Sequence, residues 1–221
     1  MSLAPVIMFV YNRADHFEST FEALTKCPEC KDTDLFIFAD GAKSEAGLEK
    51  VNACRKAVRD ADYGVFKSVT ITESEKNRGL AASVISGVTE VINKYGKAIV
   101  VEDDCKPSQY FLSWMNNSLN YFASDKKTGA IAGYSPAIKF PEDYNHDIFT
   151  AYRSCSWGWA TWEDRWENID WELKDFGEFC KSRKLRKKLN SNGADRFLRL
   201  SRQLGGGSSW SVRFGAHLVK N

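Results

Sequence analysis

The first 104 residues repeat one pattern, in which a short apolar run is followed by a polar turn and a longer stretch with helical periodicity. The apolar runs are rich in β-branched and aromatic residues, and they predict strands at Val6–Tyr11, Asp34–Ala39, Ser68–Thr72 and Ala98–Val101. The stretches between them carry apolar residues on one helical face, as in Leu80, Val84, Val88 and Val91. Strands and helices that alternate in this way form right-handed βαβ units. The pattern therefore predicts an α/β fold with a mostly parallel central sheet flanked by helices.

The chain beyond residue 104 has a different character. It predicts a helix at Gln109–Phe122, a strand-like piece at Gly129–Gly133, a basic helical stretch from Lys181 to Leu204 and a last strand-like piece at Trp210–Val219. Five of the seven tryptophans lie at positions 157, 159, 162, 166 and 171. Because no linker or internal repeat separates the two parts, we expect one domain over residues 1–221, in which residues 105–221 cap the sheet of residues 1–104.

Charge balance and cysteine content exclude several classes of protein. The chain has 31 Lys and Arg against 29 Asp and Glu, whereas general nucleic-acid-binding proteins carry a large basic excess. No apolar run approaches the roughly 20 residues that span a bilayer, so we expect neither a membrane-spanning helix nor a signal peptide. Six cysteines at uneven spacing lack the density of a secreted disulfide scaffold. We therefore expect free thiols, no nucleic-acid partner and a cytoplasmic protein.

Polar side chains follow the predicted strands at the points where the strands end. Asn12 and Arg13 follow the first strand, Asp40 the second and Arg78 the third, and the fourth ends in the acidic triplet Glu102–Asp104. In an open α/β sheet, ligands bind outside the carboxyl ends of the strands. Guanidinium groups match phosphate geometry, and carboxylates can bind ribose hydroxyls or a metal. A sugar nucleotide needs this mixture of groups.

The acidic triplet Glu102–Asp104 is the most specific of these sequence features. Carboxylates this close repel each other when ionised, and Mg²⁺ or Mn²⁺ completed by substrate phosphates and water relieves the repulsion. The alternative is a solvated acidic turn or a helix N-terminus, where Asp and Glu are favoured by the helix dipole. With Arg13, Asp40 and Arg78 expected on the same edge, we favour the metal. The chain has no dinucleotide fingerprint, P-loop or nucleophile elbow, which argues against dehydrogenases, P-loop kinases and serine hydrolases.

Five segments in this order resemble glycosyltransferases of the GT-A fold, specifically the branch near N-acetylglucosaminyltransferase I and the bacterial family 2-like sugar transferases. The segments are Phe9–Arg13, Phe38–Gly41, Asn77–Leu80, Val101–Asp104 and Ser156–Trp162. The resemblance covers nearly the whole chain. It implies a nucleotide-diphospho-sugar transferase fold, with residues 1–104 as the half that binds the nucleotide sugar and residues 105–221 as the acceptor side. Members of this family usually continue further, so we expect a domain cut short at its C-terminus.

The resemblance also implies roles for the residues at the strand ends. In such enzymes the acidic triplet is the DXD-type motif, whose last residue contacts the metal, so Asp104 would be the metal ligand. Glu102 and Asp103 would face the sugar or ribose. The other donor-binding residues would be Arg13 and Asp40 at the nucleoside, Arg78 near the diphosphate, and Asn12 in the same set.

The activity implied by the resemblance is a metal-dependent, inverting transfer of a sugar from a nucleoside-diphosphate sugar, most commonly a UDP-sugar, to a glycan or lipid-linked glycan, as in bacterial polysaccharide biosynthesis. A carboxylate would act as general base on the acceptor hydroxyl. Asp164, with Glu163 second, follows a Trp-Gly segment as an acidic pair does in β-galactosyltransferases. In the nearer branch the base is an Asp just before a Trp, but here Gly205–Trp210 contains no acid.

Two other functions stay open at the level of the sequence. A nucleotidyltransferase would also combine an α/β sheet, an acidic metal site and basic residues, but such enzymes commonly carry a Gly-rich loop after the first strand, and Tyr11–Asp15 is not Gly-rich. A non-catalytic glycan- or nucleotide-binding module would use the tryptophans as a platform for sugar rings. The same tryptophans could instead form a buried core, and we expect Trp157 and Trp159 to be the exposed pair.

The stretch Lys181–Lys188 is the one local basic cluster of the sequence. Such a run is usually a solvated helix face, yet it can also attract anionic lipid headgroups. If the acceptor is a lipid-linked glycan, the cluster would hold the protein peripherally at the inner face of the membrane.

Overall fold

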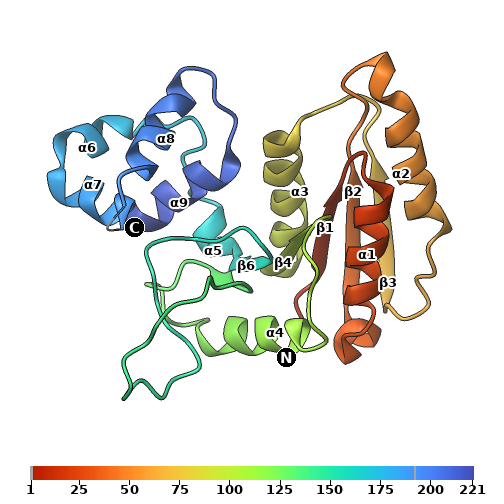
Figure 1. Ribbon diagram of the computed structural model, residues 1–221, viewed down its shortest axis with the longest axis horizontal. Coiled ribbons are helices and arrows are strands. Elements are labelled where there is room, and N and C mark those ends of the chain that lie inside the picture. Colours follow the sequence, from red (N-terminus) through yellow and green to blue (C-terminus); the bar gives the residue numbers. More distant parts are fainter. Residues whose placement is uncertain (1, 192) are drawn as a thin grey trace.

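The computed structural model describes residues 2–191 and 193–221 (Figure 1). Its sheet has the strand order β3-β2-β1-β4-β6-β5. Strands β1 to β4 are parallel, β6 is antiparallel to β4, and β5 is antiparallel to β6. The strands span Val6–Val10 (β1), Asp34–Ala39 (β2), Ser68–Glu73 (β3), Lys97–Glu102 (β4), Ile131–Ala132 (β5) and Trp159–Trp162 (β6). The predicted α/β fold with a mostly parallel sheet is confirmed.

Helices cover both faces of the sheet, which explains why its central strands are continuous apolar runs rather than alternating ones. On one face, Val6, Met8 and Val10 of β1 pack against the helices α1, α2 and α4. On the other face, Ile7 and Phe9 pack against α3. The helices span Ala14–Leu24 (α1), Leu48–Asp60 (α2), Leu80–Tyr95 (α3) and Phe111–Tyr121 (α4), with short 3₁₀ turns at Pro28–Asp32 and Glu45–Gly47.

The close approach of α3 to the sheet depends on Gly87. A Cβ atom at this position would lie 2.9 Å from the Phe9 ring and 3.1 Å from the Phe38 ring. These two rings stack with their centroids 5.5 Å apart. A larger residue would therefore push α3 away from β1 and β2, and with it the segment that precedes α3 at the strand ends.

The second half of the chain builds a helical lobe beside the sheet, drawn in blue in Figure 1. Four of its helices enclose a small core made of Leu173, Phe179, Leu189, Leu200, Ala216 and Val219. Within the described residues, the segment between β5 and β6, residues 133–158, contains no helix or strand. The helices of this half after α4 span Glu163–Trp166 (α5), Phe176–Lys181 (α6), Arg183–Asn190 (α7), Arg196–Leu204 (α8) and Trp210–Lys220 (α9).

The prediction of a strand at Trp210–Val219 is wrong, because this segment forms α9. Trp210 and Phe214, one helical turn apart, pack against α3 and Trp159. Ala216 and Val219 face the core of the lobe. A short apolar run can form either a strand or a helix. Here the helical period lets the segment bury Trp210 and Phe214 against the sheet side and Ala216 and Val219 in the core of the lobe. The predicted helix near Gln109–Phe122 is confirmed as α4, and the strand-like Gly129–Gly133 contains the two-residue strand β5. The helical stretch predicted for Lys181–Leu204 is confirmed in part, since it forms two separate helices, α7 and α8, and its residue 192 lies outside the described residues.

All six cysteines are free thiols, as predicted. No helix within the described residues is both long enough and apolar enough to cross a membrane.

Candidate active site

The ends of the first and fourth strands are tied together by an ion pair. The guanidinium of Arg13, just after β1, donates to the carboxylate of Asp103 and, at 3.1 Å, to Oδ2 of Asp104. These residues meet because β1 and β4 are neighbouring parallel strands whose carboxyl ends lie at the same edge. The ends of β1 and β4 thus carry three carboxylates, those of Glu102, Asp103 and Asp104, but only one guanidinium, which leaves an excess of negative charge.

Asp103 is directed into the protein rather than toward a ligand. Its side chain is only 6% exposed, it pairs with Arg13, and its main-chain carbonyl accepts a hydrogen bond of 2.7 Å from Thr20 of α1. Burial raises the pKa of Asp103, although the hydrogen bond from Arg13 opposes this shift. The expectation that Asp103 faces the sugar or ribose is therefore not supported, because the residue anchors the end of β4 to α1.

Glu102 lies on the face of β4 that α3 covers, because it is in register with Phe9 of β1, whose ring packs on α3. Burial, together with repulsion from Asp104 and Asp103, raises the pKa of Glu102 to about 7, and only Arg13 opposes the shift. The carboxylates at the end of β4 are thus not fully neutralised by Arg13, and a bound cation could supply the missing positive charge. Asp104 has a 43% exposed side chain and is available as a ligand.

Asp104 fits a Mg²⁺ or Mn²⁺ site that substrate phosphates complete. No group of three or more His, Cys, Asp or Glu side chains within residues 2–191 and 193–221 is arranged to hold a metal by itself. Mg²⁺ is usually bound by one or two carboxylates together with phosphates and water, so one exposed carboxylate beside a second acid is sufficient for this type of site.

Asp40 organises a loop instead of presenting its carboxylate to a ligand. It is 8% exposed, and Oδ1 accepts hydrogen bonds of 2.8 Å from the main-chain nitrogens of Gly41 and Arg78. Oδ2 accepts from the Asn77 amide at 3.0 Å and the Gly79 nitrogen at 2.9 Å. Its carboxylate therefore fixes the segment that leads into α3, and direct contact with a nucleoside is not what its geometry favours.

Arg78, which Asp40 holds by its backbone, has an exposed side chain at the start of α3. Among the described residues, no carboxylate forms a salt bridge with its guanidinium, so it is free to contact a phosphate. Asn12 is half-buried at the end of β1. The structure thus brings Asn12, Arg13, Arg78 and Asp104 to the edge where the parallel strands end.

The acidic pair Glu163 and Asp164 lies at the other end of the sheet. Strand β6 runs antiparallel to β4, with Trp162 opposite Lys97, so residues after Trp162 are near the start of β4. Lys97 and Glu102 are five positions apart along the strand, a distance of roughly 16 Å. Asp164 pairs there with Lys126 and, at 2.6 Å, with Arg165. The structure therefore does not bring Asp164 or Glu163, the residues predicted to act as general base, next to Asp104.

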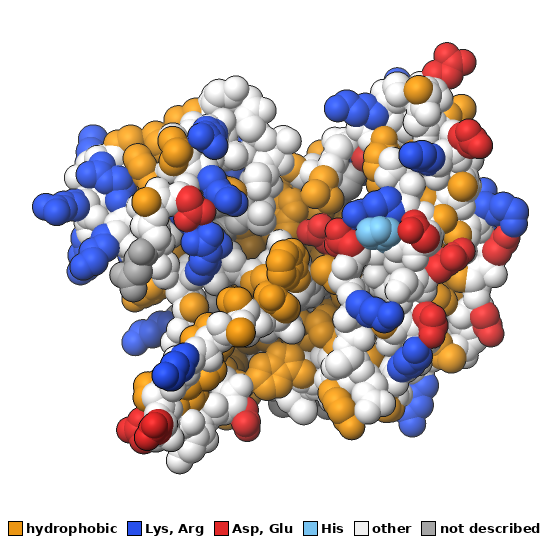
Figure 2. Space-filling view, viewed as in Figure 1, with side chains coloured by type: hydrophobic (Ala, Val, Ile, Leu, Met, Phe, Trp, Pro, Cys, Tyr) orange, Lys and Arg blue, Asp and Glu red, His pale blue; other side chains and the backbone are white. Residues whose placement is uncertain are grey.

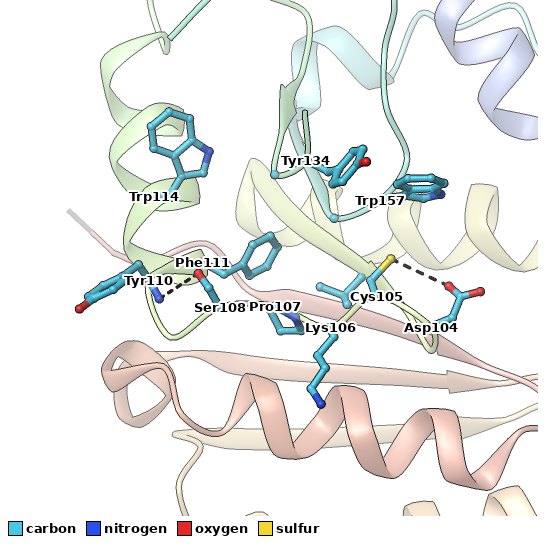
Figure 3. Close-up of a pocket in the computed structure, with 13 residues that line it drawn as sticks. Asp104, Cys105, Lys106, Pro107, Ser108, Tyr110, Phe111, Trp114, Tyr134 and Trp157 are labelled. Carbon is cyan, nitrogen blue, oxygen red and sulfur yellow. Dashed lines mark hydrogen bonds between the residues drawn. The ribbon is translucent and has the colours of Figure 1, made fainter. Parts of the chain in front are cut away.

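A cavity of about 660 Å³ adjoins Asp104 (Figure 3). Aromatic side chains form much of its wall, and its lining consists of Val101, Asp104, Cys105, Lys106, Pro107, Ser108, Tyr110, Phe111, Trp114, Gly133, Tyr134, Trp157 and Gly158. The ring of Trp157 is 58% exposed and contacts Tyr134 edge to face, with centroids 4.7 Å apart. Trp159, in contrast, is 1% exposed. The expectation of an exposed pair was right for Trp157 and wrong for Trp159.

Tyr134 was missed at the level of the sequence, because its position just after a strand is a signal only when the direction of β5 is known, and the pairing with β6 sets that direction. Strand β5 runs parallel to β4, because both are antiparallel to β6. Tyr134 comes two residues after β5, so it lies at the same edge as Asp104. Tyr110 and Trp114 carried no such signal, since they flank the start of a helix whose position depends on tertiary packing.

This chain resembles known proteins in its structure but not in its sequence. No protein-family model and no curated protein sequence matches it. Solved structures similar to it include the mannosyltransferase PcManGT from Pyrobaculum calidifontis in complex with GDP-Man and Mn²⁺, with 16% identity and a TM-score of 0.52 over 76% of this chain and 46% of that one. TarS 1-349 from S. aureus has 10% identity and a TM-score of 0.44, over 72% and 47% of the two chains.

A putative nucleotide-diphospho-sugar transferase from Desulfovibrio desulfuricans G20 has 12% identity and a TM-score of 0.42, over 92% and 97% of the two chains. The chain spans about half the length of PcManGT and of TarS 1-349. At sequence identities of 10–16%, a structural similarity indicates a shared fold and not a shared function. Together with the parallel sheet and its antiparallel β6, the similarity to PcManGT identifies the fold as the GT-A type.

Proposed function

We propose that this protein is a metal-dependent glycosyltransferase that transfers a sugar from a nucleoside-diphosphate sugar to a hydroxyl group of a glycan. One observation carries the proposal: Arg78 and Asp104 lie at one edge of a GT-A sheet, and Asp104 also lines a cavity with exposed aromatic rings. A phosphate-binding cation and a metal-binding carboxylate suit the donor. An aromatic cavity suits a sugar acceptor, because sugar rings stack on aromatic faces.

In the proposed reaction the acceptor oxygen forms a bond to the anomeric carbon while the bond from that carbon to the diphosphate breaks. The electron pair leaves with the nucleoside diphosphate, and the hydroxyl proton passes to a base. A Mg²⁺ or Mn²⁺ held by Asp104 would supply positive charge beside the leaving diphosphate. Arg78 would bind a phosphate oxygen, and Asp40 would keep the Arg78 backbone in place. We propose inversion at the anomeric carbon, as in the branch that the sequence resembles.

The donor is tested by calorimetric titration with UDP, GDP, CDP and dTDP, each with Mn²⁺ and with excess EDTA. We expect one nucleoside diphosphate, UDP on the basis of the sequence resemblance, to bind only when the metal is present. GDP belongs in the series because PcManGT was solved with GDP-Man. Asp104→Asn should reduce the metal-dependent affinity at least about tenfold, since it removes a charged ligand. Full Mn²⁺-dependent affinity in this variant would contradict the metal assignment.

The same samples distinguish the two other functions. A nucleotidyltransferase would release pyrophosphate from a nucleoside triphosphate, whereas the proposed enzyme releases a nucleoside diphosphate from a sugar nucleotide. A non-catalytic module would bind its sugar unchanged in excess EDTA and release neither product. Proton NMR of the product glycan gives the anomeric configuration and so tests inversion.

We propose in addition that the lobe of α6–α9 contacts an anionic membrane surface. Residues 176–221 contain 11 of the 31 Lys and Arg but only 2 of the 29 Asp and Glu, and basic side chains crowd over this lobe in Figure 2. Of the cluster Lys181–Lys188, four members are exposed: Lys181, Arg183, Lys184 and Lys187. Leu198 and Leu204 of the neighbouring α8 are also exposed and could enter the interface. Such contact would bring a lipid-linked acceptor to the site.

Co-sedimentation with vesicles of phosphatidylcholine alone, or with phosphatidylglycerol added, tests this contact. The double substitution Lys184→Glu with Lys187→Glu should weaken binding to the anionic vesicles at least about tenfold. Lys31→Glu with Lys50→Glu, an equal charge change at exposed positions of the N-terminal half, is the control. Equal loss in both double variants would show that only net charge matters, and would contradict a docking surface on the lobe.

A further inference from the structure

The cavity beside Asp104 exposes an unusual amount of aromatic surface. Tyr110 is 68% exposed, and Trp157 and Tyr134 are 58% and 45% exposed, whereas Phe111 beneath them is buried. Large exposed aromatic rings that converge on one cavity mark a binding site more often than scattered ones do. Figure 3 shows them in sequence along the cavity, from Tyr110 and Trp114 at one end to Trp157 and Asp104 at the other.

The wall that carries Tyr134 and Trp157 is built before any ligand arrives. The main-chain nitrogen of Gly133 donates to the carbonyl of Gly158 at 2.7 Å, which joins the two segments next to these rings. A Cβ atom on Gly133 would lie 2.6 Å from the Phe111 ring, and one on Gly158, where φ is +66°, would lie 2.9 Å from it. Both backbones are therefore pressed against a buried ring, so Tyr134 and Trp157 start from fixed positions.

The chemistry of the lining favours a neutral ligand. Asp104 and Lys106 are the charged residues among the described residues that line the cavity, and in Figure 3 the Lys106 side chain extends away from the aromatic rings. Within the described lining, no cation therefore faces the rings to attract an acidic group. Ser108 adds a hydroxyl that can bond to a sugar hydroxyl. The volume of about 660 Å³ lies within the roughly 300–1,000 Å³ of pockets that bind drug-sized ligands.

We infer that this cavity is the acceptor site and that it takes a neutral oligosaccharide. Its terminal sugar lies between Asp104 and the Tyr134–Trp157 pair, and the preceding sugars extend along Tyr110 and Trp114. The assignment rests on the proposed glycosyltransferase function for the word acceptor, but the binding of a neutral glycan can be measured without any transfer.

The test measures the binding of neutral glycans by tryptophan fluorescence and calorimetry. The probes are disaccharides and tetrasaccharides of glucose, galactose, mannose and N-acetylglucosamine, with a tetrasaccharide of galacturonic acid as the acidic counterpart. We expect one neutral tetrasaccharide to bind at least about tenfold more tightly than its disaccharide, because additional rings reach Tyr110 and Trp114. No binding of any neutral probe, or tighter binding of the acidic one, overturns the inference.

Variants locate the binding. Trp157→Ala and Tyr110→Ala should each weaken the tetrasaccharide about tenfold, and Trp157→Phe, which keeps an aromatic face, should restore much of the affinity. Tyr121→Ala is the matched control, since Tyr121 is 78% exposed at the far end of α4 and does not line the cavity. Unchanged affinity in both Trp157→Ala and Tyr110→Ala overturns the inference.

Nucleoside-diphosphate binding, measured on the same protein samples, separates the two proposals. If a nucleoside diphosphate binds with Mn²⁺ and no neutral glycan does, the inference about the cavity fails alone. If the neutral tetrasaccharide binds through Trp157 and no nucleoside diphosphate does, the cavity is a glycan site and the proposed transferase function fails.

Discussion

In the N-terminal half, residues 1–104, strands lie where the apolar runs predict them, and each polar residue at a strand end reaches one edge. In the C-terminal half, Trp157 and Trp159 are two residues apart in a similar sequence context, yet one is exposed in a cavity and the other is buried. The difference lies in what covers each ring. The register of a parallel sheet aligns its strand ends. Whether a tryptophan of the second half is buried depends instead on helices that come later in the chain.

The cover of Trp159 comes from distant parts of the sequence. Its ring lies 5.0 Å from the ring of Trp210, 5.2 Å from that of Phe214 and 5.7 Å from that of Trp166, measured between centroids. Two of these partners belong to α9, about fifty residues further along the chain. A substitution in this cluster should therefore report on the packing of the whole lobe against the sheet.

The largest expected effect is that of Trp159→Ala. Removing this buried ring leaves a cavity among three aromatic neighbours and should lower the free energy of unfolding by about 3–5 kcal/mol. Trp157→Ala, the matched substitution at an exposed ring, should change it by less than about 0.5 kcal/mol. Urea unfolding followed by circular dichroism measures both values. Similar losses in the two variants would contradict the division between core and cavity.

An intermediate effect is expected in the N-terminal half from Asp40→Asn. An asparagine keeps one oxygen acceptor but places an amide where the carboxylate accepts main-chain bonds, so some donors become unpaired. We expect a loss of about 1–3 kcal/mol in the free energy of unfolding, together with weaker nucleoside-diphosphate binding because Arg78 is no longer held. Glu75→Gln, an exposed change nearby, should affect neither quantity. Normal stability combined with lost binding would instead indicate direct contact of Asp40 with the ligand.

The smallest effect is expected from Asp164→Asn. Burial would raise the pKa of Asp164, but hydrogen bonds from Lys126 and Arg165 outweigh it and lower the pKa. The ionised form thus contributes stability at neutral pH, which is lost as the pH falls through the lowered pKa of the folded state. Because the side chain is 41% exposed, the loss should be at most about 1 kcal/mol.

The turnover of this variant distinguishes the two ends of the sheet. Transfer rates of Asp164→Asn should equal those of the unchanged protein, because Asp164 lies near the start of β4 and Asp104 at its end. A turnover lowered by orders of magnitude would mean that the acidic pair reaches the reaction after all.

Much of the fold and part of the site could be predicted from local patterns. The periodicities predicted four parallel strands and their helices, and the strand ends predicted that Arg13, Arg78 and Asp104 lie at the same edge of the sheet. The orientation of each acid could not be predicted in the same way. Asp103 pairs with Arg13 and Asp40 binds backbone nitrogens, because each carboxylate depends on which groups a neighbouring loop brings within reach.

What the sequence determined by itself is therefore the α/β sheet and the set of polar residues at its edge, since strand and helix periods are local and a parallel register aligns the strand ends. Only the tertiary structure decided which acids face outward, which tryptophan is buried, that Trp210–Val219 is helical, and that Glu163 and Asp164 lie at the opposite end of β4 from Asp104. These outcomes depend on the antiparallel direction of β6 and on the docking of α9. Contacts between residues far apart in the chain determine both, and no local pattern encodes them.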